Sequence, residues 1–194
     1  MSDDIRETAY HEAGHCVVGG IFGHGCDDAS IVPGDGTLGH VTANGMYWVE
    51  DDVNRDLDRE LVEERVCSLY AGLEERVCSL YAGYAAQVRF APESAERARL
   101  GAGSGAGSDD ERAEELLEMA GLATAADRER LRARSAQLVA EHWPAVERIA
   151  VELLEHQRLG GQEVEALLEV VRGDSSEEDL ARFRIRMRGS GKPK

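Results

Sequence analysis

The sequence predicts a mainly α fold with a small β-sheet, an α+β class, and three observations support this prediction. Apolar residues recur at helical spacing over most of the chain. Two short runs, near residues 31 and 40, are separated by turn-forming residues and read as strands. The chain has 194 residues, of which 42% are hydrophobic, and this is enough for one domain with a real core.

The first predicted helix covers residues 5–22, where small and apolar residues form a stripe. Thr8 is expected to cap its start, and Gly23 and Gly25 follow its end, where glycine is common. Gly14 lowers the intrinsic helicity, but it would let another element approach closely.

This helix carries the motif H-E-x-x-H, as His11, Glu12 and His15. Residues four apart lie on one face of a helix, so both imidazoles can bind one Zn²⁺. The Glu between them can reach a metal-bound water, which is the arrangement of a zinc hydrolase. The alternative is a pair of surface histidines on an ordinary helix.

Residues 30–32 and 38–42 are the expected strands, and Pro33 to Gly36 provide turn chemistry between them. A hairpin or small sheet is therefore expected directly after the motif helix.

A long helix is expected from Asp56, and it contains an unchanged repeat, because residues 63–72 recur as residues 74–83. An offset of 11 residues is close to three helical turns, so the second copy keeps the apolar face in place and adds about 16 Å of helix. We interpret it as a tandem duplication over 63–83 without function. The alternative is that one copy loops out.

Residues 101–108 read as a flexible Gly/Ala/Ser loop, followed by a helix that Ser108 and Glu111 begin as a capping box. Helical spacing continues over 127–157, where Pro144 either kinks the helix or lies in the first turn after a break near His142 and Trp143, and again over 162–171. One domain is placed at 1–172. Residues 173–194 form a polar tail with a basic end, which we expect to be frayed.

The net charge of −16 argues against nucleic-acid binding. No apolar run is long enough for a membrane span, and the acidic start is not a signal peptide. The four cysteines have no C-x-x-C pairing and read as reduced thiols. These features predict a soluble cytoplasmic protein that does not bind a membrane.

Several segments, in the same order along the chain, resemble the peptidase domain of FtsH, the membrane-anchored AAA+ zinc protease. The similar segments are residues 8–15, 30–33 with 37–40, 82–87 (family pattern A-G-R-A-A-E), 105–109 (G-A-x-N-D) and 146–168. The chain departs from the family at Tyr84 and Gln87, which replace Arg and Glu, and at Ser108, which replaces Asn. It also contains neither transmembrane segments nor an ATPase module.

The resemblance implies that Asp109 is the third zinc ligand beside His11 and His15, and that Glu12 is the general base. A slip of one residue in the glycine-rich loop would put Asp110 in that place. The resemblance also implies a hexameric ring of identical chains. An unfolding ATPase would have to act as a separate partner.

The expected function is therefore an ATP-independent zinc metalloendopeptidase that hydrolyses unfolded proteins or peptides. Two alternatives remain. One is a non-catalytic protein-interaction module on a protease-like fold, since fold alone does not establish activity. The other is a regulatory peptidase with one dedicated protein substrate.

Overall fold

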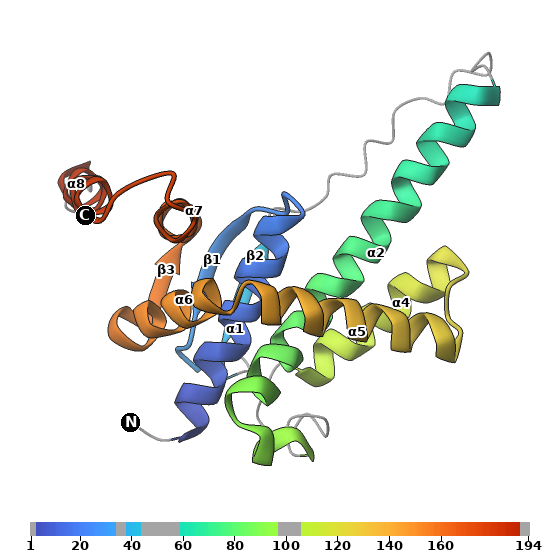
Figure 1. Cartoon of the computed structure of the whole chain (residues 1–194), viewed down its shortest axis with the longest axis horizontal. Helices are drawn as coiled ribbons and strands as arrows, with labels where there is room; N and C mark the ends of the chain where they lie inside the picture. The colour runs from blue at the N-terminus through green and yellow to red at the C-terminus, as the bar shows by residue number, and fades with distance from the viewer. Residues whose placement is uncertain (1–2, 34–37, 44–58, 97–105, 191–194) are drawn as a thin grey trace.

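The computed structural model describes residues 3–33, 38–43, 59–96 and 106–190, with side chains omitted at 43, 59–71, 106–108 and 188–190. The described chain is mostly helical with one small sheet, so the predicted α+β class is confirmed (Figure 1). The elements, in chain order, are α1 (Asp3–Ile21), β1 (Cys26–Ser30), β2 (His40–Ala43), α2 (Arg59–Phe90), η1 (Pro92–Ser94), α4 (Ala106–Ala120), α5 (Ala125–Glu141), α6 (Trp143–His156), β3 (Arg158–Gly160), α7 (Gly161–Arg172) and α8 (Glu177–Ser190).

The predicted motif helix is confirmed as α1, which lies at the centre of the fold and packs against α2 and α6. Gly14 permits the contact with α2, because a Cβ at this position would lie 2.8 Å from the Cβ of Ala86. The predicted cap at Thr8 is wrong. The helix begins at Asp3, and the Thr8 hydroxyl donates a hydrogen bond to the Asp4 carbonyl 2.8 Å away, inside the helix.

The sheet is antiparallel, with the strand order β2-β1-β3. The predicted strands were misplaced by a few residues: β1 ends at Ser30 rather than beginning there, and β2 begins at His40. The start of β1 was not recognised as strand, because Asp27 and Asp28 are acidic and only the last two residues of the strand are buried. Strand β3 was not predicted, since a three-residue strand has too little periodicity to be recognised.

Helix α2 runs without interruption through both copies of the 11-residue repeat, so neither copy loops out. The second copy packs in the protein, with Val77, Cys78 and Tyr81 buried. The N-terminal half of α2 projects away from the sheet and from α6 (Figure 1). The duplication therefore lengthens a projecting part of the helix.

Two predictions around residue 108 are wrong. Helix α4 begins at Ala106, so residues 106–108 are helical rather than loop, and Ser108 lies inside the helix instead of capping it. Residues 101–105 lie outside the described part of the chain. Of the two alternatives at Pro144, the break is confirmed: α5 ends at Glu141, and α6 begins at Trp143 with proline in its first turn.

Helix α7 confirms the predicted helix at 162–171, but the expected fraying beyond it is wrong, because α8 follows. Leu180 is buried in the main core. Arg184 of α8 forms ion pairs with Glu152 of α6 and with Glu163 of α7, at 2.5 and 2.7 Å. The charged residues that suggested a frayed tail thus form ion pairs, which hold α8 against α6 and α7.

The main core lies between α1, α6, α7 and the sheet, and a second buried cluster lies between α2, α4 and α5. Within the described residues, no helix combines the length and the apolar character required to cross a bilayer.

Candidate metal centre

His11 and His15 lie one turn apart on α1 and direct their rings to the same point. Their Nε2 atoms are 3.1 Å apart, and the ring planes meet at 75°. The helical spacing of the motif explains this convergence, because residues four apart share a helix face. The His11 side chain is buried and that of His15 is nearly so, with 2% and 11% exposed.

Asp109 reaches the same point from the first turn of α4. One carboxylate oxygen, Oδ2, lies 3.1 Å from the Nε2 atom of each histidine. A carboxylate in the first turn of a helix is also stabilised by the helix dipole. The structure thus brings together the three residues that the sequence suggested as ligands, although 94 residues separate His15 from Asp109.

The second nitrogen of His15 is held by the backbone of α2. Its Nδ1 lies 2.8 Å from the carbonyl oxygen of Ser79. Because a carbonyl only accepts, Nδ1 must carry the proton, and a neutral His15 then presents a lone pair at Nε2. Metal-binding histidines are commonly oriented by such a hydrogen bond. The Nδ1 atom of His11 has no corresponding partner among the described residues.

Two glycines make room for the site. A Cβ at Gly83 of α2 would lie 2.6 Å from the Nε2 atom of His11 and closer still to that of His15. A Cβ at Gly39, just before β2, would lie 2.6 Å from a carboxylate oxygen of Glu12. The backbone therefore closes directly against the imidazoles and the carboxylate, which a side chain at either position would prevent.

The charges of the site are strongly coupled. Burial lowers the pKa of His15, but the facing Asp109 carboxylate outweighs this effect and raises the pKa to about 9. Burial raises the pKa of Asp109, yet the two imidazoles hold it well below its usual range. Without a metal, a proton at Nε2 of His15 therefore bridges the ring and the carboxylate. A divalent cation at this point would replace that proton.

Glu12 is buried beside these groups, with 3% of its surface exposed. Burial raises the pKa of its carboxyl group, and the neighbouring imidazoles act in the opposite direction. A carboxylate with a raised pKa is a stronger base than an exposed one.

The three donor atoms fit a zinc ion. Tetrahedral zinc with bonds of about 2.0–2.1 Å separates its ligand atoms by about 3.3–3.4 Å, close to the 3.1 Å found here. Two imidazoles and one carboxylate are a donor set found at catalytic zinc sites and also at iron(II) sites, so the set indicates a divalent transition metal without identifying it. Three protein ligands are also the number that leaves a catalytic zinc one position for water or substrate.

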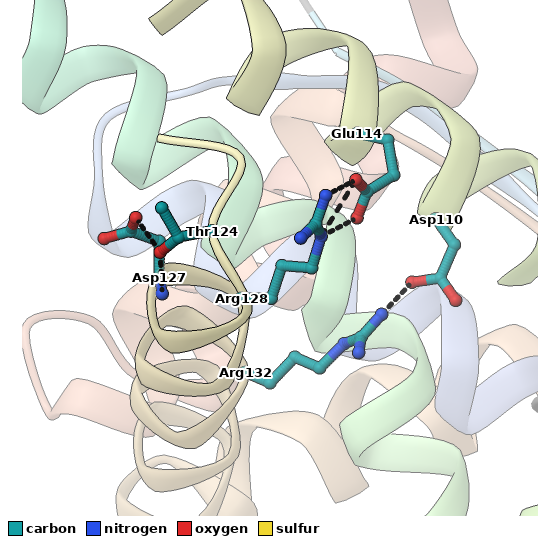
Figure 2. A network of polar contacts seen from close by, with 6 residues as sticks. All are labelled: Asp110, Glu114, Thr124, Asp127, Arg128 and Arg132. Carbon is teal, nitrogen blue, oxygen red and sulfur yellow. Dashed lines mark hydrogen bonds and ion pairs between the residues drawn. The ribbon is translucent and has the colours of Figure 1, made fainter. Parts of the chain in front are cut away.

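Asp110, the alternative third ligand, lies outside this group. Its carboxylate accepts a hydrogen bond from Arg132 of α5 at 3.2 Å. One turn further on, Glu114 binds Arg128 of α5 through both carboxylate oxygens, at 2.5–2.9 Å. Figure 2 shows both acidic side chains of α4 directed toward the arginines of α5. This network joins α4 to α5 by ion pairs close to Asp109.

The remaining described histidines also lie outside the metal group. His40 is 3.4 Å from Asp28, and His156 is 3.4 Å from Glu152. Both histidines lie beside carboxylates that do not belong to the metal group.

Sequence reasoning missed three supporting features. The Ser79 contact uses a backbone carbonyl, which leaves no sequence signal. Gly83 was noticed only as part of the A-G segment. Gln87, a departure from the family pattern, donates a hydrogen bond from its amide to buried Glu7 at 3.1 Å. A Glu at position 87 would have placed a second buried carboxylate against that of Glu7, and the amide avoids this repulsion.

No protein-family model matches this chain, and the search of curated proteins found no significant match.

Proposed function

We propose that this chain is a zinc metallopeptidase that hydrolyses peptide bonds in unfolded proteins or peptides without ATP. The observation that carries the proposal is the convergence of two imidazole nitrogens and one carboxylate oxygen beside a buried glutamate. This is the set of groups that zinc-dependent peptide hydrolysis requires. The chemistry consumes no nucleotide, so the assay is run without one.

His11, His15 and Asp109 would hold the zinc. When bound, the metal polarises the scissile carbonyl and lowers the pKa of a coordinated water toward 7. The carboxylate of Glu12 accepts a proton from the attacking water and delivers it to the leaving amine. The Ser79 carbonyl keeps the lone pair of His15 directed at the metal position.

The position of strand β2 is an argument for an extended polypeptide as the substrate. It is an edge strand of the described sheet, and Gly39 at its start lies against the Glu12 carboxylate. An edge strand offers unpaired backbone groups, to which an extended peptide can add as a further strand. A peptide bound in this way passes close to the catalytic base.

The resemblance to the FtsH peptidase domain agrees with this function, since its segments contain both histidines, Glu12 and Asp109. On the same ground we propose a hexameric ring, and a separate ATPase that delivers unfolded substrate.

The test is cleavage of a labelled unfolded protein such as casein, with zinc and without ATP. We expect wild type to turn over and Glu12→Gln to lose at least about 100-fold in rate while retaining zinc, because general-base catalysis contributes about 10²–10⁴-fold. Absence of turnover in zinc-loaded wild type would contradict general peptidase activity. It would favour an interaction module or a dedicated substrate.

Two neighbouring carboxylates provide matched controls. Asp109→Asn should lose both zinc and activity. Asp110→Asn removes the same charge one residue away, where the side chain faces Arg132, and should retain activity and lose no more than a few-fold of the zinc affinity, because an exposed ion pair contributes little.

A further inference from the structure

Two cysteines approach each other where the C-terminal part of α1 meets the start of β1. Cys16 lies on α1 and Cys26 begins β1, and their sulfur atoms are 3.8 Å apart, with the Cys16 thiol donating to Cys26. The intervening turn produces this approach: Gly23 adopts a positive φ of 74°, and the His24 amide donates to the Gly19 carbonyl at 2.9 Å. The chain thus reverses directly after the metal-binding helix.

The separation is short enough for a bond to form with little movement. A disulfide requires about 2.05 Å between the sulfur atoms, so they must close by about 1.8 Å, a distance that side-chain rotation can supply. Cys78 is different: it lies in the second core cluster, and its thiol faces the Leu131 carbonyl at 3.8 Å. The side chain of Cys67 lies outside the described residues.

A cavity gives small molecules access to the pair. Its volume is about 930 Å³, it is bounded by the end of α1, β1, α7 and α8, and both cysteines line it. Cys26 is partly exposed, whereas Cys16 is buried with 2% of its surface exposed. An oxidant entering from solvent therefore reaches Cys26 first.

The two thiols have different chemical roles. The hydrogen bond from Cys16 lowers the pKa of Cys26, although burial and the neighbouring aspartates oppose this. A thiolate at Cys26 is thus stabilised by the neighbour that would later react with its oxidised form. This is the arrangement of an attacking cysteine with a resolving cysteine.

We propose that Cys16 and Cys26 form a reversible disulfide when hydrogen peroxide enters this cavity. The Cys26 thiolate attacks one peroxide oxygen, the O–O bond breaks, and hydroxide leaves, giving a sulfenic acid at Cys26. The Cys16 sulfur then attacks the Cys26 sulfur, an S–S bond forms, and the sulfenic oxygen leaves as water with the Cys16 proton. One peroxide is reduced as two thiols are oxidised, and added dithiol reverses the reaction.

The disulfide would join the helix that bears both histidines to the central strand of the sheet. It does not depend on the proposed peptidase activity, because neither sulfur belongs to the metal group. The site is therefore a redox modification site in its own right.

Tryptic mapping of the full-length chain tests the proposal. Cys16 and Cys26 fall on one peptide, from Glu7 to Arg55, whereas Cys67 and Cys78 fall on two others. After peroxide and then iodoacetamide, we expect peptide 7–55 to lose two hydrogens and to carry no alkyl group, and dithiothreitol to restore both alkylations. Alkylation of both cysteines in this peptide, or a bond from either one to Cys67 or Cys78, would overturn the proposal.

Variants separate the two roles. Cys16→Ser should leave a sulfenic acid on Cys26 that dimedone traps, and Cys26→Ser should leave Cys16 fully alkylated. Cys78→Ser is the matched control and should form the disulfide at the wild-type rate. Failure of dimedone to label Cys26 in Cys16→Ser, with the fold verified by circular dichroism, would contradict the assigned order of attack.

Discussion

At the scale of single residues, the site brings three Lewis-basic donor atoms to one point. His11, His15 and Asp109 present donor atoms 3.1 Å apart, an arrangement that requires a shared proton or a cation. Gly83 allows this approach because it has no side chain. The centre therefore depends both on its three ligands and on the absence of a side chain at Gly83.

Gly83→Ala should therefore abolish zinc binding or weaken it at least about 10-fold, because the new methyl group would occupy the space of the imidazole nitrogens. The measurement is zinc titration by calorimetry, with helicity followed by circular dichroism. Gly72→Ala is the matched control: its Cβ would contact nothing, so it should bind zinc normally and stabilise α2 by up to about 1 kcal/mol. Equal zinc affinity in both variants would contradict the assigned role of Gly83.

The His15–Asp109 pair predicts how the stability of the metal-free protein depends on pH. The pKa of folded His15, about 9, lies above its ordinary value of 6.5. The stabilisation is thus fully present below pH 6.5 and is lost as the pH rises through 9. With a chelator present, the thermal midpoint should fall over this window. His15→Gln should flatten that fall, and an unchanged slope in the variant would show that another group is responsible.

Residue-level reasoning identified His11 and His15 as ligand candidates, whereas Asp109 came from the resemblance, with Asp110 left as the alternative. The two aspartates are adjacent, and the sequence before them is glycine-rich. The structure separates them, because one turns to the histidines and the other to Arg132. The Ser79 contact was not predictable, since backbone carbonyls are common to all residues.

At the scale of elements, the site is assembled by α1, α2 and α4. Helix α1 supplies two ligands and the base, α2 supplies the close backbone, and α4 supplies the carboxylate. The contacts between α1 and α2 include the small-residue contact at Gly14, the buried Glu7–Gln87 hydrogen bond and the hydrogen bond from His15 to the Ser79 carbonyl. Helix α4 buries Ala113 and Leu117 in the cluster that it shares with α2 and α5, and the arginines of α5 add ion pairs to its acidic side chains (Figure 2).

We expect the double variant Arg128→Ala/Arg132→Ala to weaken zinc affinity by no more than a few-fold. Exposed ion pairs contribute little each, and these two join α5 to the helix that carries Asp109. Arg130→Ala is the control, because Arg130 pairs with Glu74 of α2 rather than with α4. Zinc titration compares the variants. A larger loss in Arg130→Ala than in the double variant would refute the positioning role of the α4–α5 network.

Element boundaries were predicted well where one apolar face was long. The helical stretch around the motif and the break at Pro144 are examples. Prediction failed where tertiary contacts decide the structure. Strand β3 exists because it pairs with β1, and α4 begins earlier than the Ser108 capping pattern indicated.

At the scale of the whole molecule, the C-terminal segment belongs to the fold. Its charged residues predicted a frayed tail, but α8 buries Leu180 and forms ion pairs with α6 and α7 through Arg184. Composition alone could not show this, because a charged helix with few apolar residues resembles a solvated segment until its partners are known.

Two chemically different sites also lie along α1. The metal group lies where α1 meets α2 and α4, and the Cys16–Cys26 pair faces the cavity bounded by α7 and α8. The central helix therefore connects a proposed catalytic centre with a proposed redox site. The two can be tested independently.

The most direct test of the central claim is a crystal structure of the zinc-loaded protein, with anomalous scattering recorded at the zinc absorption edge. The account predicts one zinc ion per chain, bound by the Nε2 atoms of His11 and His15 and by the Asp109 carboxylate. A zinc ion bound through Asp110, or at ligands that do not include both histidines, would contradict it.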